Sequence, residues 1–226
     1  TYKNMLESKF ISESQYKRSL DSILGIHYND SVHASPNTAI KENFWKDYKF
    51  QKLPYSRGRI FAWFTDLWIQ KETAGKKSLK DVMLLVLNKC RTERVEFSKR
   101  LFIETVQQVS GIAINPAIEK YIEQGQFISL EDWNAVSNHA FVYKPVQVFT
   151  YGFTTDMGRL DRNAKVTALD EEANAAKAGL KVGDVLKGFN IYNDPTKEAE
   201  LVVERNKQML TFKFYPAKQI TMLQLK

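Results

Sequence analysis

The sequence predicts a chain of two domains, an all-α helical domain over about residues 1–138 followed by a β domain over about 145–226. Two observations lead to this prediction. Apolar residues recur with a helical period up to about residue 138, and from about Pro145 onward they mostly alternate with polar residues, as they do in half-buried strands. With 226 residues, 43% hydrophobic and 26% charged, the chain is long enough for two modest cores.

The first two helices are predicted from a cap and from apolar faces. Ser12 and Gln15 form a capping-box pattern before a helix over 13–24, and Gly25 is expected to end that helix. A second, shorter helix is predicted over 38–48. The residues that it is expected to bury are Ile40, Phe44, Trp45 and Tyr48.

A long helix follows, and we expect Pro54 to open it, because a proline in the first turn lacks only a donor that would be unpaired there. Gly75 is expected to close this helix. Ser78 and Asp81 then cap a helix that runs to about Cys90. The remaining helical segments are predicted over 97–109, over 116–125 and, as one further turn around Trp133, over 129–137.

The second half reads as short strands separated by turns. Asn206-Lys207 is expected to form a hairpin turn between two of the strands, and a short helix near 174–178 is expected to end at Gly179. The predicted strands cover 147–153, 165–169, 185–189, 201–205, 209–214 and 220–225.

The charge and the hydropathy pattern argue against nucleic-acid binding and membrane insertion. The net charge is +7 and the pI is about 9.3, but the basic residues are scattered among acids and accompany no recognition motif. We expect a mixed solvated surface and no nucleic-acid partner. Binding through net charge alone would show as steeply salt-dependent retention on an anionic resin. No apolar run is long enough to span a bilayer, so no membrane span is expected.

The sequence does not determine the cellular compartment of the protein. No signal peptide is visible, but the chain begins with Thr1 rather than Met, which is compatible with a start that was removed together with a signal. Localisation is therefore unknown, with the periplasm, the cell envelope or secretion in a bacterium favoured over the cytoplasm.

The histidines and the cysteine predict no metal site. None of the three histidines (His27, His33 and His139) lies in a His-Glu-x-x-His motif. His27 and His33 are six residues apart rather than the four that place two imidazoles on one helix face, so we expect surface histidines. The single cysteine, Cys90, excludes an intramolecular disulfide and a Cys-based zinc site, and we expect it to be buried and inert. We predict no metal and no cofactor in this chain.

Residues 53–83 carry the first of two resemblances. Leu53-Pro54-Tyr55-Ser56-Arg57-Gly58, the apolar helix after it and Gly75-Lys-Lys-Ser-Leu-Lys-Asp-Val-Met83 resemble the helical C-terminal part of the catalytic domain in the glycyl aminopeptidase-like family of gluzincin zinc metallopeptidases. In the wider gluzincin aminopeptidases, a Tyr followed by x-[Arg/Lys]-Gly points its phenol at the scissile carbonyl. The resemblance implies that Tyr55 is catalytic and that Arg57 and Gly58 bind substrate.

Pattern alone supports other roles for the same three residues. From pattern alone, an aromatic buried at the first turn of a helix is the favoured interpretation of Tyr55. Arg57 either binds a substrate carboxylate or pairs with a nearby acid. Gly58 is expected to let the helix approach another backbone closely.

The second resemblance lies in the β domain. Ala173-Asn-Ala-Ala-Lys-Ala-Gly179-Leu-Lys-Val-Gly183-Asp-Val-Leu186 is similar to a PDZ domain of the bacterial protease type. Upstream, Tyr151-Gly152-Phe153 resembles the loop and strand that hold a peptide C-terminus in such domains. Residues 190–200 leave no space for the second PDZ helix, which forms one wall of the peptide groove. We therefore expect a truncated PDZ-like domain that serves as a packing or gating module rather than capturing peptide tails.

The two resemblances together imply the C-terminal fragment of a zinc-dependent aminopeptidase-like protein. The zinc, its His-Glu-x-x-His motif and its downstream Glu would belong to the N-terminal catalytic portion of the same protein, and the substrate of the full-length parent would be a peptide. The isolated chain is expected to hydrolyse nothing. The alternative is a non-enzymatic interaction protein with a helical and a PDZ-like domain, and the coding sequence upstream of Thr1 distinguishes the two hypotheses.

Overall fold

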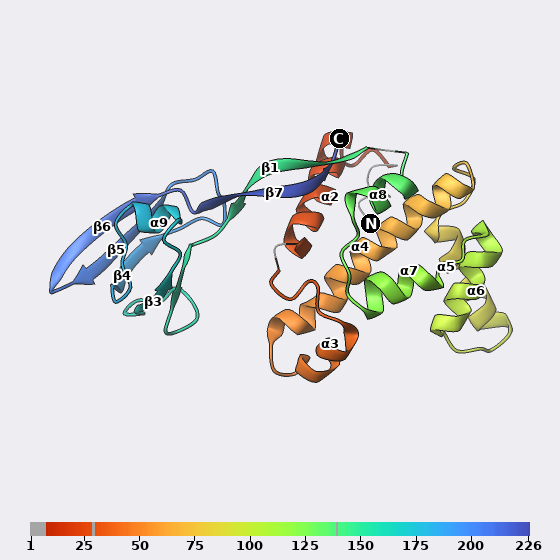
Figure 1. Ribbon diagram of the computed structural model, residues 1–226, viewed down its shortest axis with the longest axis horizontal. Helices are drawn as coiled ribbons and strands as arrows, with labels where there is room; N and C mark the ends of the chain where they lie inside the picture. Colours follow the sequence, from red (N-terminus) through yellow and green to blue (C-terminus); the bar gives the residue numbers. More distant parts are fainter. Residues whose placement is uncertain (1–7, 29, 139) are drawn as a thin grey trace. The chain divides into compact units, whose positions relative to one another are not determined.

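The computed structural model describes residues 8–28, 30–138 and 140–226 (Figure 1). The described chain forms two compact units, one reaching up to Lys144 and including Met222–Lys226, the other being Pro145–Thr221. The predicted fold class is confirmed, because a helical part precedes a part built from small antiparallel sheets. The sequence assigned residues 222–226 to the β domain, whereas the structure places them in the first unit, where the Leu225 N–H donates to Asp21 Oδ1 at 3.1 Å.

Helix α4 (Tyr48–Glu72) is the central helix of the first unit (Figure 1). Its buried residues recur every three or four positions, so they form one continuous face toward the core. These residues are Leu53, Arg57, Ile60, Phe61, Phe64, Thr65 and Ile69. The helices that contact α4 are α2 (Glu13–Tyr28), α3 (Asn37–Asn43), α5 (Leu79–Thr92), α8 (Leu130–Val136) and the π-helix η1 (Ile118–Glu123).

Two further helices of the described part of this unit are α6 (Lys99–Ser110) and the short α7 (Asn115–Ala117). The sequence predicted a single helix over 116–125. The structure instead continues α7 directly into η1, in which the backbone hydrogen bonds span five residues rather than four. Gly111 adopts a left-handed conformation with φ of 76° at the end of α6, as a C-terminal glycine does.

The prediction that Pro54 opens the long helix is wrong. Helix α4 begins six residues earlier, at Tyr48, where the side chain of Asp47 caps it by accepting from the Lys49 N–H at 2.8 Å. Pro54 therefore lies inside the helix and lacks the N–H that would donate to the carbonyl of Phe50.

Two capping boxes predicted from the sequence are confirmed. Ser12 and Gln15 exchange hydrogen bonds at 2.8 and 3.3 Å before α2, and Ser78 and Asp81 form the corresponding pair before α5. The end predicted for the first helix at Gly25 is wrong, because α2 continues to Tyr28.

Gly25 lies inside the helix and packs against Met222. A Cβ at Gly25 would lie 2.5 Å from Cε of Met222, so a side chain there would require the flexible end of the Met222 side chain to shift.

The aromatic residues around α3 are more exposed than the sequence suggested. Trp45 and Tyr48 are 86% and 65% exposed, respectively, because α3 ends at Asn43 and does not carry them into the core. The other tryptophans do pack against the core, and Trp133 is fully buried within it. Cys90 is half-buried, not buried as predicted.

The second unit has a core that is separate from the first, built around Phe153, Leu186, Leu201 and Phe214. Strand β2 (Phe153–Thr155) pairs antiparallel with β3 (Val166–Leu169). An antiparallel meander contains β4 (Val185–Asn190), β5 (Ala199–Arg205) and β6 (Gln208–Phe214). Strand β1 (Phe141–Phe149) pairs with β7 (Ala217–Leu225).

Turns in this unit follow the sequence signals more closely than strand ends do. Asn206 and Lys207 have φ values of 52° and 65°, which confirms the hairpin turn. The short helix α9 (Asn174–Lys177) is followed by Gly179 with a φ of 107°. The single strand predicted over 147–153 is wrong, because β1 ends at Phe149 and β2 starts at Phe153. No helix lies between β4 and β5.

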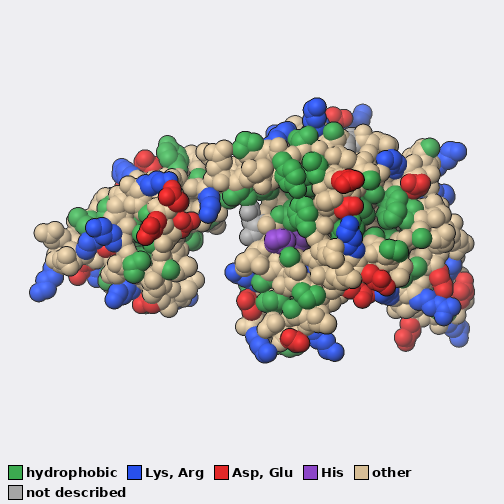
Figure 2. Space-filling view, in the orientation of Figure 1, with side chains coloured by type: hydrophobic (Ala, Val, Ile, Leu, Met, Phe, Trp, Pro, Cys, Tyr) green, Lys and Arg blue, Asp and Glu red, His purple; other side chains and the backbone are tan. Residues whose placement is uncertain are grey.

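The surface carries charges of both signs. Lys and Arg side chains are interspersed with Asp and Glu over the face drawn in Figure 2, as expected for a mixed solvated surface. Within the described ranges, no helix combines the length and the apolar character needed to cross a membrane.

Candidate functional site

The Tyr55 side chain lies on the exposed side of α4. It is 75% exposed, so the alternative of an aromatic buried at a helix start is wrong. The helical period places Leu53 and Arg57 toward the core and leaves Tyr55 and Gly58 on the solvent side. The phenol is thus carried on the solvent side of the helix, where a molecule outside this unit can reach it.

Gly58 has open space around it. A Cβ built at Gly58 would meet no atom within 4 Å, so the close backbone approach expected there does not occur. Gly58 is three residues after Tyr55, and residues with that spacing are neighbours on a helix surface. Its missing side chain therefore leaves the surface beside the Tyr55 phenol uncovered.

Arg57 lies on the opposite side of the same turn and is only 5% exposed. Its guanidinium donates to the carbonyls of His33 at 2.9 Å and Ile122 at 3.1 Å, to the Ser35 carbonyl, and to Asn37 Oδ1 at 3.4 Å. These partners are backbone and amide oxygens, not the nearby acid that was one of the two alternatives predicted for Arg57. Burial lowers the pKa of Arg57 below its ordinary value, but a guanidinium stays charged in proteins.

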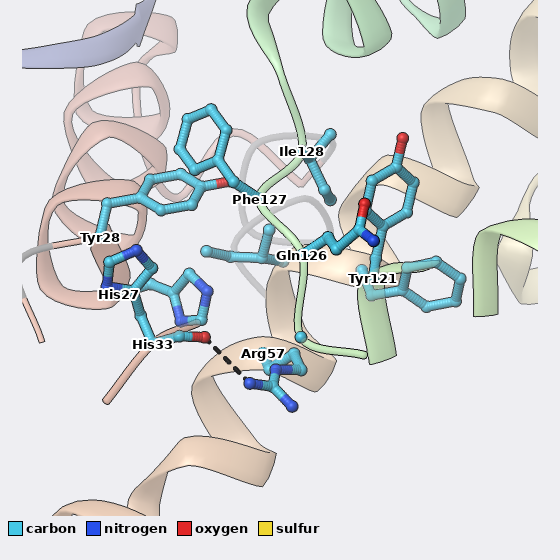
Figure 3. Close-up of a pocket in the computed structure, with 11 residues that line it drawn as sticks. His27, Tyr28, His33, Arg57, Tyr121, Gln126, Phe127 and Ile128 are labelled. Atoms are coloured by element: carbon cyan, nitrogen blue, oxygen red, sulfur yellow. Dashed lines mark hydrogen bonds between the residues drawn. The ribbon is translucent and has the colours of Figure 1, made fainter. Parts of the chain in front are cut away.

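A small pocket adjoins Arg57 and contains two histidines (Figure 3). His27 contributes from α2, His33 from the segment before α3, and Gln126 and Phe127 from the segment after η1. The His27 and His33 rings meet edge to face with centroids 5.9 Å apart. Because Arg57 contributes from α4, the pocket collects residues from four segments of the chain, namely α2, the segment before α3, α4, and η1 with the segment after it.

His27 is buried, not on the surface as predicted. Its Nδ1 lies 3.2 Å from Ser56 Oγ, and the Ser56 hydroxyl donates to the Leu53 carbonyl at 3.1 Å. Because that hydroxyl has only one hydrogen, it accepts from the Nδ1–H of a neutral imidazole. Burial, then the neighbouring His33 and Arg57, lower the pKa of His27 to about 4. His27 is uncharged at neutral pH.

These residues do not form a zinc site. The described residues contain no group of three or more His, Cys, Asp or Glu side chains that could hold a metal ion. His27 and His33 come with no carboxylate and adjoin a buried guanidinium, which repels a cation. His139 lies outside the described residues.

The Tyr151–Phe153 segment is tightly packed in the second unit. The Gly152 N–H donates to Thr150 Oγ1 at 3.1 Å, and its carbonyl accepts from the Asp170 N–H at 2.8 Å. Phe153 is buried, and Tyr151 packs against the same core. The Gly152 amide thus has a partner in the chain itself, and the peptide-binding role of this segment stays a prediction.

The sequence did not reveal which segments surround Arg57. The carbonyls of His33, Ser35 and Ile122 leave no trace in the sequence, because every residue offers one. Gly125 gave the one usable signal, but it was interpreted only as a helix end. It has a φ of 70°, and a Cβ there would lie 2.4 Å from the Ser35 carbonyl oxygen.

Comparisons with known proteins show likeness in fold alone. No protein-family model matches the chain, and no curated protein matches it. Among solved structures, it is similar to an aminopeptidase N family protein from Idiomarina loihiensis, with a TM-score of 0.54 and 16% sequence identity. The match covers 98% of this chain but 44% of that one, so this chain spans less than half the length of its structural neighbour.

Proposed function

We propose that this chain is the C-terminal portion of a zinc-dependent aminopeptidase-like enzyme and that Tyr55 stabilises the transition state of peptide hydrolysis. The carrying observation is the exposed phenol of Tyr55 on a helix turn whose other side is held by Arg57. The fold supports the proposal, since nearly the whole chain matches part of an aminopeptidase N family protein.

The chemistry assigned to Tyr55 requires only a hydrogen-bond donor. When water attacks a peptide carbonyl, negative charge develops on the carbonyl oxygen. A phenol O–H aimed at that oxygen binds the transition state more strongly than the substrate. Gly58 leaves the surface beside the phenol open to the substrate chain.

The zinc would be held elsewhere in the parent protein. Since the described residues do not fit a zinc ion, its ligands would belong to an N-terminal catalytic portion, which would also be the partner of this chain. Zinc would supply an activated water at neutral pH. The isolated chain would therefore be inactive, and its compartment would be that of the parent, with the bacterial cell envelope favoured.

The second unit would serve as a PDZ-like packing or gating module. Its Gly152 amide, which would cup a peptide carboxylate in a PDZ domain, already donates to Thr150. No helix stands between β4 and β5 to wall a peptide groove. Both observations support packing over peptide-tail capture.

The test is Tyr55→Phe in the full-length parent. Losing one transition-state donor typically lowers kcat by about 10²–10³-fold. Tyr48→Phe is the matched control, because Tyr48 is another exposed tyrosine, at the start of the same helix, and we expect the kcat of this variant to be unchanged. An unchanged kcat for Tyr55→Phe would overturn the proposal.

A non-enzymatic interaction protein is the second candidate. The observation that favours it is the lack of a metal-binding group among the described residues. Sequencing the coding region upstream of Thr1 separates the two candidates. A His-Glu-x-x-His motif followed by Glu supports the enzyme, and a region without it supports the interaction protein.

A further inference from the structure

Arg57 joins three separate segments of the first unit. Its acceptors belong to the segment before α3 (His33 and Ser35), to the first residue of α3 (Asn37) and to the end of η1 (Ile122). No ion pair with Arg57 occurs within the described ranges, so these oxygens are the groups that compensate its buried charge. Removing the guanidinium would leave several half-buried carbonyls without this partner.

Gly125 completes this joint. Its φ of 70° is a left-handed conformation, and a Cβ at this position would lie 2.4 Å from the Ser35 carbonyl oxygen and 2.9 Å from Nη2 of Arg57. Backbone cannot yield easily, so any side chain here would push Ser35 and Arg57 apart. The glycine allows the segment after η1 to close directly over the guanidinium.

The first turns of α4 depend on the hydrogen bonds of Arg57 for their orientation, because Pro54 weakens the backbone hydrogen bonding there. This proline removes the backbone hydrogen bond to Phe50, and its ring crowds that carbonyl, so the turn carrying Tyr55 is less firmly fixed by the backbone. Side chains hold it instead. Arg57 anchors the turn to the neighbouring segments, and Ser56 bonds both the Leu53 carbonyl and His27.

We infer that Arg57, seated against Gly125, is a positioning residue for Tyr55. It fixes the orientation of the α4 turn on which the phenol stands, and it does so from the buried side without contacting substrate. This inference rests on the proposed function only for its catalytic consequence. The structural coupling between Arg57 and Tyr55 can be measured in this chain alone.

The first experiment reports on Tyr55 directly. The chain is labelled with 3-fluorotyrosine, and the Tyr55 resonance is assigned by comparison with Tyr55→Phe. We expect Arg57→Lys and Gly125→Ala to shift or broaden this resonance. Arg100→Lys, an exposed arginine on α6, and Gly158→Ala, a left-handed glycine with open space around it, are the matched controls and should leave it unchanged.

The second experiment measures kcat and KM of Arg57→Lys in the full-length parent. A misplacement of about 1 Å can cost up to about 10²-fold in rate. We expect kcat to fall by about ten- to a hundredfold while KM stays within about twofold, since Arg57 touches no substrate. A role confined to stability would reduce the amount of folded enzyme and leave the kcat of the folded fraction unchanged.

The outcomes separate the two claims. An unchanged Tyr55 resonance in folded Arg57→Lys overturns the inference, whatever the function. Should that variant not fold, Asn37→Ala, which removes one acceptor and keeps the guanidinium, is measured in the same way. A Tyr55 resonance that is unchanged in Asn37→Ala overturns the inference. Normal kcat in Tyr55→Phe refutes the proposed function and leaves the coupling to stand on the resonance.

Discussion

The Asp184–Arg205 ion pair is predicted to hold the second unit together. The Asp184 side chain is 1% exposed and accepts from Nε and Nη2 of Arg205, both at 2.6 Å, and from the Lys181 N–H at 2.9 Å. Arg205 also donates to the Gly179 carbonyl at 2.8 Å. The pair therefore ties the turn between Gly179 and Asp184 to the end of β5.

The change Asp184→Asn removes the charge and keeps the shape. Breaking a buried ion pair by removing one partner costs about 3–5 kcal/mol. The Arg205 side chain is 25% exposed, so water screens it in part and the lower end, about 3 kcal/mol, applies. For a domain of 60–100 residues, this lowers Tm by roughly 12–24 °C.

The assay is amide hydrogen exchange of β4, β5 and β6 in the full chain, with a thermal melt followed by circular dichroism. The matched control is Asp161→Asn, whose partner Arg159 is 76% exposed. Exposed pairs contribute about 0–1 kcal/mol, so the control should stay near wild type. Equal losses in the two variants, or a loss below about 1 kcal/mol in Asp184→Asn, would refute the reasoning.

The same pair predicts a pH dependence. Burial acts to raise the pKa of Asp184, but the hydrogen bonds from Arg205 and Lys181 outweigh it and hold the pKa below its usual range. As the pH falls, Asp184 in the folded state thus binds a proton at a lower pH than it does in the unfolded chain. The stabilisation is complete above the unfolded pKa of about 3.9 and is lost as the pH falls through the folded pKa. Asp184→Asn should lack this contribution.

Three further outcomes are expected. The pKa of His27 is lowered by burial to about 4, so the folded state favours neutral imidazole. The contribution of His27 to the free energy of unfolding, up to about 3 kcal/mol, should be complete above pH ~6.5 and lost as the pH falls toward 4. The free energy of unfolding of His27→Gln should lack this pH dependence. Gly152→Ala should destabilise the chain by more than Gly158→Ala in chemical denaturation, because its Cβ would lie 2.2 Å from that of Ala173, whereas Gly158 has open space and only the strain of a positive φ. Zinc-loaded and dialysed chain should retain no stoichiometric zinc in elemental analysis, since its described residues offer no ligand set.

The sequence by itself determined the order of the two parts and most of the turns. Helical and alternating periods in the apolar residues follow from burying one face of a helix or a strand, which is a local requirement. Ser78 with Asp81 and Asn206 with Lys207 act through hydrogen bonds and φ values within a few residues. These interactions involve residues that are close in sequence, so the sequence alone predicts them, and these predictions were confirmed.

Only the tertiary structure decided the environment of the candidate site. Pro54 predicted a helix start, but the helix begins at Tyr48, after the cap at Asp47, and continues past Pro54. The sequence predicted His27 to be a surface residue, whereas the structure buries it beside Ser56 and Arg57. The acceptors of Arg57 are backbone carbonyls from segments up to 65 residues away, and every residue carries such a carbonyl. Which of them meet a buried charge depends on how distant segments pack, and no local pattern encodes that.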